Sequence, residues 1–277
     1  MNRVAVLTYH AMNISGNSHA SNDHVALAED LDRLSRDNIR VRPLSDVIDA
    51  LLGGRLDRIA GSVAITFDDG SDFDFLDLPH PTWGPQRGMA GIIDDTIDAT
   101  GHDTIEATSF VVVSPDARVA LDRTCMIGAG WWNDDWWHVA EAGGRLRVES
   151  HSWDHNHSAL MQRVSAAEAG TFDIADSADA DREIRDANAY LCARRGRSEP
   201  VLFAYPYGEA NEFLAREYFP RGRFAHGVRA AFTTAGRPVE RTTDRWLVPR
   251  YVCGWHWKSS DDLRRLLDDA FASADRR

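Results

Sequence analysis

Short apolar runs that alternate with helical patterns constrain the fold of this chain most strongly. Val4–Leu7 is such a run, and the leucines of the following segment Val25–Asp37 are spaced to share one helix face. This order returns along the sequence and is typical of βα units around a mostly parallel sheet. Further strands are expected at Ser62–Phe67, Thr108–Val113, Leu146–Glu149, Val201–Ala204, Ala230–Thr233 and Leu247–Val252, and further helices at Ser45–Leu52, Ala90–Ala99, Trp131–Ala142, Ala166–Arg194, Glu212–Tyr218 and Ser259–Ala274.

Composition narrows the class of protein further. The 277 residues are 43% apolar and show no repeat or linker, so we expect one domain over residues 1–277. No apolar run is long enough for a membrane span, and the net charge of −12 argues against nucleic acid as a partner. The first residues turn polar too soon for a signal peptide, which predicts a cytoplasmic protein, with secretion of a trimmed form left open. The oligomeric state stays unknown.

Three polar segments follow predicted strands. Asp68-Asp69-Gly70 follows the strand that ends at Phe67, His151 and His155 follow the strand that ends at Glu149, and Tyr205 follows Ala204. Because the carboxyl ends of parallel strands meet at one edge, we expect these segments to assemble there, where α/β proteins place their active sites.

These side chains suit a divalent metal ion. Carboxylate and neutral imidazole are typical ligands of Zn²⁺, and three protein ligands leave a position for water. The three cysteines are widely separated and form no Cys-x-x-Cys pair, which excludes a thiolate site of the usual spacing. Zn²⁺ is the expected ion, with Co²⁺ or Ni²⁺ as alternatives.

The motifs resemble those of the polysaccharide deacetylase family, the NodB-homology group also called carbohydrate esterase family 4. Thr66-Phe67-Asp68-Asp69-Gly70 and His151-Ser152-Trp153-Asp154-His155 are similar to its first two motifs, and Tyr205-Pro206-Tyr207-Gly208 is similar to most of its third. The resemblance implies an α/β fold, a distorted (β/α) barrel with fewer than eight regular strands. It also implies removal of N-acetyl groups from amino sugars or N-acetylated oligo- and polysaccharides.

The resemblance also implies roles for single residues. Asp69, His151 and His155 would hold the metal ion, and Asp68 would be the general base for the attacking water. The backbone N–H of Tyr207 would donate to the oxyanion that develops on the substrate.

Two family features are altered in this sequence. Ala204 stands where the family has an arginine that tethers the catalytic aspartate, and Arg250, on a late strand, is a candidate replacement. The general acid normally comes from a late Leu-x-His motif, which is imperfect here. We expect His10, at the end of the first strand, to be the acid, with His256 as the alternative.

Aromatic residues near the motifs are candidates for sugar binding. We expect Trp132 and Trp136, from the tryptophan-rich stretch 131–137, to line the cleft together with Trp153, Tyr205 and Pro206. Core packing is the competing interpretation for the tryptophans. The long segment Ser71–Arg87 is a further candidate, because long loops at a catalytic edge often shape substrate access.

Two other functions remain open at this level. The first is a hydrolase of another small amide or cyclic imide on the same metal site. The second is a carbohydrate-binding protein on a decayed catalytic fold, for which Ala204 is the best argument. Fold alone does not decide between them, because barrels support many chemistries.

Overall fold

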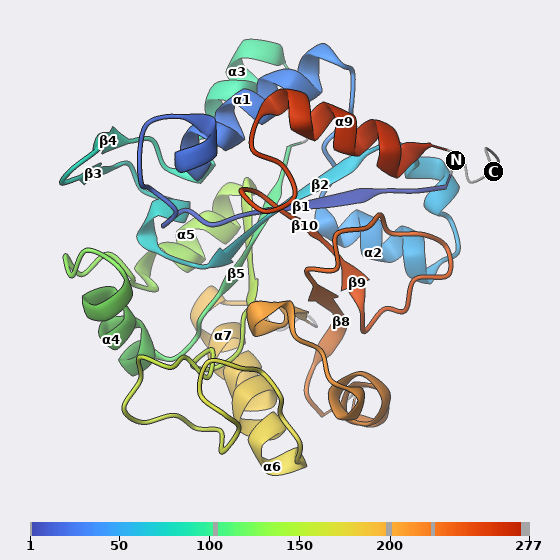
Figure 1. Cartoon of the computed structure of the whole chain (residues 1–277). Coiled ribbons are helices and arrows are strands. Elements are labelled where there is room, and N and C mark those ends of the chain that lie inside the picture. The colour runs from blue at the N-terminus through green and yellow to red at the C-terminus, as the bar shows by residue number, and fades with distance from the viewer. Residues whose placement is uncertain (1, 102–104, 198–200, 223–224, 273–277) are drawn as a thin grey trace.

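The computed structural model describes residues 2–101, 105–197, 201–222 and 225–272. Its main sheet has eight parallel strands in the order β10-β1-β2-β5-β6-β7-β8-β9 and curves into a nearly closed barrel (Figure 1). The strands are β1 Ala5–Tyr9, β2 Val63–Asp69, β5 Ala107–Val111, β6 Leu146–Ser150, β7 Val201–Ala204, β8 Val228–Thr233, β9 Val248–Pro249 and β10 Tyr251–Val252. The α/β barrel expected from the sequence is therefore confirmed.

The barrel closes at Arg250, which separates its last two strands. β9 pairs with β8 through Val248, and β10 pairs with β1 through Tyr251. Pro249 has no N–H to donate to a neighbouring strand, so a regular ladder cannot continue through this point. The single strand expected over Leu247–Val252 is thus two short halves. If they are counted as one, the eight strands become seven.

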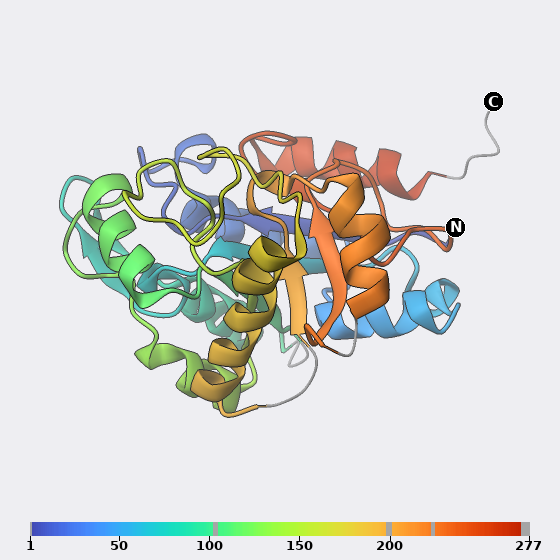
Figure 2. The same ribbon diagram turned by 90° about the horizontal axis from the view of Figure 1, so that it is seen from below.

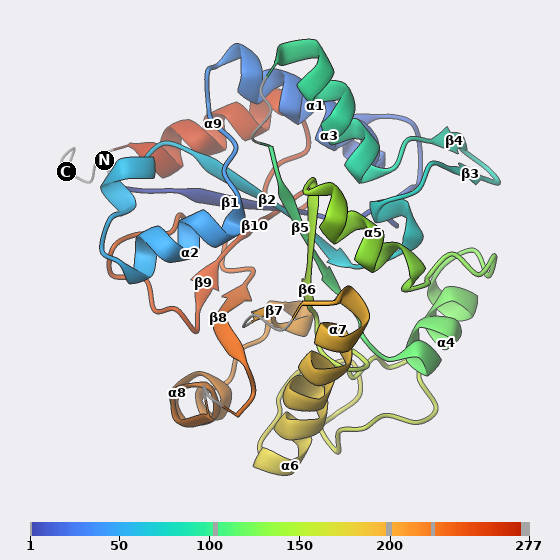
Figure 3. The same cartoon turned by 180° about the vertical axis from the view of Figure 1, so that it is seen from behind.

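Helices surround the barrel. α1, α3 and α9 lie together on one side, while α5 and α7 cover another (Figures 1 and 3). The helices are α1 Asp23–Arg36, α2 Leu44–Leu52, α3 Met89–Thr100, α4 Pro115–Cys125, α5 Asp135–Gly143, α6 Ser177–Ala180, α7 Ala187–Arg195, α8 Phe219–Gly222 and α9 Ser260–Phe271, with π-helical turns at Asp181–Asp186 and Phe213–Tyr218.

The long helix expected over Ala166–Arg194 is only partly present. Residues 166–176 are irregular and belong to the loops that connect β6 to α6 over the surface (Figure 2). Phe172 and Ile174 in this segment are fully buried, a spacing of two that suits extended chain and not a helix. The helix begins after Asp176, whose carboxylate accepts the N–H groups of Ala178 and Asp179.

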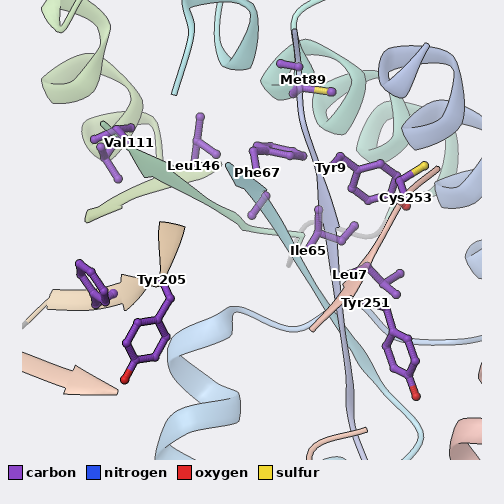
Figure 4. Packing of buried hydrophobic residues seen from close by; sticks show 14 of the residues in the cluster. Leu7, Tyr9, Ile65, Phe67, Met89, Val111, Leu146, Tyr205, Tyr251 and Cys253 are labelled. Carbon is purple, nitrogen blue, oxygen red and sulfur yellow. The ribbon is translucent and has the colours of Figure 1, made fainter. Parts of the chain in front are cut away.

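The strands bury side chains on both faces. Leu7 and Tyr9 of β1 pack with Ile65 and Phe67 of β2 in the outer layer, beneath the helices (Figure 4). Alternate residues point into the barrel, and a second apolar cluster fills it. Towards the carboxyl ends this interior becomes polar, because the Thr8 and Thr66 hydroxyls are hydrogen-bonded at 2.9 Å and Asp68 comes next.

The segment Ser71–Arg87 contains a small hairpin of its own. β3, Leu78–His80, pairs antiparallel with β4, Gly84–Gln86, and the hairpin projects from one side of the barrel (Figure 1). The Gln86 side chain accepts a hydrogen bond from Asn22 at 2.8 Å. This contact fastens the hairpin to the loop that follows β1.

Candidate active site

Asp68 is clamped by Arg250 at the carboxyl end of the barrel interior. The Arg250 Nη1 and Nη2 atoms donate to Asp68 Oδ1 at 2.6 Å and Oδ2 at 2.8 Å, and both side chains are buried. Burial alone would raise the pKa of Asp68, but the charges of Arg250 and His151 outweigh it and lower the pKa below its usual range. The carboxylate therefore stays ionised, and the contact expected between Arg250 and Asp68 is present.

Asp69, His151 and His155 meet beside this clamp. Asp69 Oδ1 is 3.6 Å from His151 Nε2 and 3.8 Å from His155 Nε2. Within the described chain, these three residues form a group whose ligand atoms all lie within 4.8 Å of one another. Metal–ligand bonds of about 2.0–2.2 Å in a tetrahedral site need separations only slightly shorter than these. The triad predicted from the sequence is thus assembled.

Hydrogen bonds decide which histidines can serve as ligands. His151 Nδ1 lies 2.8 Å from the Ala204 carbonyl oxygen, which requires a proton on Nδ1 and leaves Nε2 free for a metal ion. In contrast, His157 Nδ1 accepts the Ala159 N–H at 3.1 Å, so in the neutral ring the proton is on Nε2. His157 is therefore not an alternative ligand through Nε2.

His155 is also prepared to remain neutral. Burial, together with the neighbouring His151 and His157, lowers the pKa of His155 well below its usual range. Its Nδ1 atom is buried without a hydrogen-bond partner among the described residues. A neutral imidazole is the form that binds a metal ion.

Backbone strain is concentrated at this site. Six described residues other than glycine have a positive φ, and five of them belong to the three motif segments. These five are Asp69 at 76°, Ser152 at 69°, His155 at 63°, Asn156 at 43° and Tyr207 at 59°. Such conformations are costly and persist where the surrounding structure enforces them, typically at functional sites.

Two motif glycines have clear steric reasons. Gly70 has a φ of 76°, and a Cβ atom there would lie 2.3 Å from Val111 Cγ1. Gly208 has a φ of 70°, and a Cβ atom there would lie 2.0 Å from Thr234 Oγ1. Both turns therefore require glycine to bring Asp69 and Tyr207 into place.

A buried acid supports the histidine segment from below. Glu183, in the π-helical turn, accepts the Trp153 N–H at 3.1 Å and the Asp154 N–H at 3.4 Å through Oε2. Asp154 in turn accepts the N–H groups of Asn156 at 2.8 Å and Val164 at 2.9 Å. Sequence reasoning missed Glu183, because nothing in a mostly polar helical pattern distinguishes this acid from its solvated neighbours.

His10 lies at the end of β1, on the side of the strand that faces the barrel interior, like Thr8 two residues earlier. Its backbone N–H donates to Asp23 Oδ2 at 2.7 Å, and its Nδ1 is buried without a partner among the described residues. The charge of His10 contributes to lowering the pKa of Asp68, so the two groups are neighbours. The alternative acid, His256, has its Nδ1 occupied by the Val252 N–H at 2.8 Å.

Tyr207 presents its backbone to the triad. Its ring packs edge-on against His155 with centroids 4.4 Å apart. In the part of the chain that the structure describes, the Tyr207 N–H donates to no protein group. A free N–H beside the ligand triad is what oxyanion stabilisation requires.

The residues expected to bind sugar need correction. Trp132 and Trp136 are buried, with 5% and 4% of their surface exposed, and Tyr205 and Pro206 are buried as well. Trp153 is half-buried against Tyr190. Packing therefore accounts for most of this aromatic set, although Trp132 has another role, since its Nε1–H donates to the Asp69 carbonyl at 3.0 Å. The indole thus fixes the strained backbone of Asp69.

The fold and the site together define an α/β-barrel protein with a candidate mononuclear metal centre at the carboxyl ends of its strands. A family model described as polysaccharide deacetylase matches residues 56–218, more than half of the chain. The chain belongs to the polysaccharide deacetylase family. A comparison with curated proteins gave no significant match.

Solved structures with the same fold are also deacetylases. The deacetylase PplD of Streptococcus pyogenes, solved with acetate, has a TM-score of 0.63 at 17% identity, over 96% of this chain and 98% of its own. IcaB from Ammonifex degensii has a TM-score of 0.62 at 20% identity, over 98% and 97%. A de-N-acetylase from Aggregatibacter actinomycetemcomitans has a TM-score of 0.62 at 13% identity, over 95% and 99%. At these identities the likeness establishes the fold.

Proposed function

We propose that this protein is a divalent-metal-dependent hydrolase that removes N-acetyl groups from amino sugars or N-acetylated oligo- and polysaccharides. The observation that carries the proposal is the ionised, arginine-clamped Asp68 beside the Asp69–His151–His155 triad. Membership of the polysaccharide deacetylase family supports the reaction and the carbohydrate substrate. No described helix combines the length and apolar character needed to cross a membrane.

The chain supplies the groups for each step of amide hydrolysis. Asp69, His151 and His155 would hold the metal ion, which acts as a Lewis acid and lowers the pKa of water. Asp68 accepts the proton of the attacking water as the water oxygen bonds to the acetamide carbon. The Tyr207 N–H donates to the carbonyl oxygen as negative charge develops there.

His10 completes the reaction in this proposal. It gives a proton to the amine nitrogen while the carbon–nitrogen bond breaks, which releases acetate and a free amino sugar. Asp23 holds the His10 backbone at 2.7 Å and so fixes the position of the ring.

The test is acetate release from N-acetylated mono- and oligosaccharides by the zinc-loaded protein, with Asp68→Asn alongside. Removal of the base is expected to lower kcat by about 10²–10⁴-fold, while zinc content measured by atomic absorption stays near that of the parent protein. Near-normal acetate release by Asp68→Asn would disprove the assigned base. The same panel contains small amides and cyclic imides, and activity on those alone would replace the sugar as substrate.

A further inference from the structure

A cavity of about 700 Å³ lies between α9, the segment 236–240 and residues 255–258. We call it the α9 cavity. Its volume is in the range of small-molecule sites, which combine aromatic surface with a few polar groups. Trp255 and His256 form its aromatic part, and side chains of both charges line the rest, among them Arg237, Lys258, Asp262 and Arg265.

Trp255 offers an aromatic face that is already fixed in place. Its side chain is 73% exposed, although indole is among the largest apolar groups a protein can present to water. One face stacks on His256, with ring centroids 5.5 Å apart and an angle of 20° between the planes. His256 is held by the Val252 N–H at 2.8 Å. The other face of the indole is left for a ligand.

The α9 cavity is continuous with the loop that carries His10. Gly254, which precedes Trp255, lines a second hollow of about 330 Å³ together with Met12, Asn13 and Asp23. Asp23 accepts the His10 N–H at 2.7 Å. The Cys253 N–H donates to the Thr8 carbonyl at 2.9 Å and anchors this segment to β1. The two hollows thus meet at Gly254 and lead from His10 to Trp255.

The chemistry of the reaction gives this path a direction. If His10 protonates the leaving amine, the sugar ring that bears the amine lies on the His10 side of the site. In an oligosaccharide, the neighbouring rings then extend over Gly254 towards Trp255. Sugar rings carry C–H groups on one face, whose weak positive charge suits the negative face of an indole, and hydroxyls that suit charged side chains.

We propose that Trp255 and the α9 cavity form a subsite for a neighbouring sugar ring of an N-acetylated oligosaccharide, so that oligomers are bound better than monomers. The proposal rests on the proposed function, because it uses His10 to orient the substrate. It deepens that function by assigning the substrate class to oligosaccharides.

Binding tests this subsite without relying on turnover. The affinity of an N-acetylglucosamine pentasaccharide and of the monosaccharide is measured by calorimetry on zinc-loaded Asp68→Asn protein, with and without Trp255→Ala. Loss of the indole is expected to weaken pentasaccharide binding up to about tenfold, the range of an aromatic contact, and to leave the monosaccharide unchanged. Trp255→Phe is expected to retain most of the affinity and Trp255→Leu to lose it.

Matched controls keep the result specific. Val139→Ala removes apolar surface from a side chain that is 55% exposed on α5 and is expected to change neither affinity. Unchanged pentasaccharide binding in Trp255→Ala, or equal binding by the Leu and Phe variants, would overturn the subsite. If oligosaccharide binding depends on Trp255 but no sugar releases acetate from the parent protein, the subsite stands and the proposed function fails.

Discussion

Two carboxylates inside the barrel are buried against arginine, and they lie towards opposite ends. Asp68 meets Arg250 at the carboxyl ends of the strands. Glu149 accepts hydrogen bonds from Arg195 at 3.1 Å and from Arg197 at 2.8 Å. The hollow beside Glu149 is bordered by Arg229, at the start of β8, which places this second cluster towards the amino ends.

The two clusters differ in how their surroundings treat the negative charge. Burial raises the pKa of both carboxyl groups, and at Asp68 the charges of Arg250 and His151 reverse the effect. At Glu149 the pKa remains raised, with Glu141 adding a like charge. Strained backbone and free ligand atoms occur only around the first cluster in the described chain. A buried ion pair alone therefore does not identify a functional site.

Replacement of Arg250 is expected to have the largest effect. Arg250→Met leaves the buried Asp68 carboxylate without its partner, which should lower the free energy of unfolding by about 3–5 kcal/mol and strongly reduce kcat. The stability loss is measured by urea denaturation and acetate release by a coupled assay. Arg250→Lys, which keeps the charge but not the two-pronged geometry, should be intermediate.

The pH dependence of that loss has a definite sign. In the parent protein the pKa of Asp68 is lowered, so its stabilising contribution is present above about pH 3.9 and disappears as the pH falls through the lowered value. Without Arg250, burial raises the pKa, and the carboxyl takes up a proton at higher pH. The difference between parent and variant should therefore shrink in acid. A constant difference would show that Arg250 acts mainly by packing.

Glu149→Gln is expected to separate stability from activity. The amide keeps one acceptor for Arg195 or the Leu202 N–H but loses the charge, which should cost about 1.5–3 kcal/mol of unfolding free energy. kcat/KM should stay close to that of the parent protein, because this cluster does not contact the triad. If activity fell as far as in Arg250→Met, the proposed division between the two ends would be wrong.

The sequence predicted the barrel and the metal-type triad because both depend on local patterns. Strand periodicity placed Asp69, His151 and His155 at the carboxyl ends, and parallel pairing then brought them together. The contact between Arg250 and Asp68 was also foreseen, because both ended interior-facing strands. The roles of these residues in catalysis remain predictions.

Packing between distant segments could not be predicted in the same way. Trp132 and Trp136 have the composition of a sugar-binding surface, yet both are buried, and only the tertiary fold shows that Trp132 holds the Asp69 carbonyl. Glu183 supports the histidine segment from thirty residues away, as the separation from Trp153 shows. Trp255 carried no signal apart from its type, since its exposure is set by α9 and His256.

A third buried carboxyl group, without arginine, gives the finest test of the comparison. Asp74 is fully buried, Ser109 Oγ donates to its Oδ2 at 2.5 Å, and Oδ1 has no partner among the described residues. Burial, helped by the charges of Asp69 and Asp68, raises the pKa of Asp74 well above its usual value. Asp74 is therefore expected to keep its proton in the folded protein.

Asp74→Asn should consequently stabilise the protein at neutral pH. The unfolded chain ionises near pH 3.9 while the folded protein holds the proton, so the parent loses stability as the pH rises from there towards the raised pKa. Asparagine cannot ionise, and the variant should gain about 1 kcal/mol or more at pH 7, with the gain vanishing near pH 4. Asp77→Asn is the control, because the pKa of Asp77 is lowered and the same change should not stabilise. Thermal melts from pH 4 to 8 measure both, and a destabilised Asp74→Asn at pH 7 would mean that Asp74 is ionised after all.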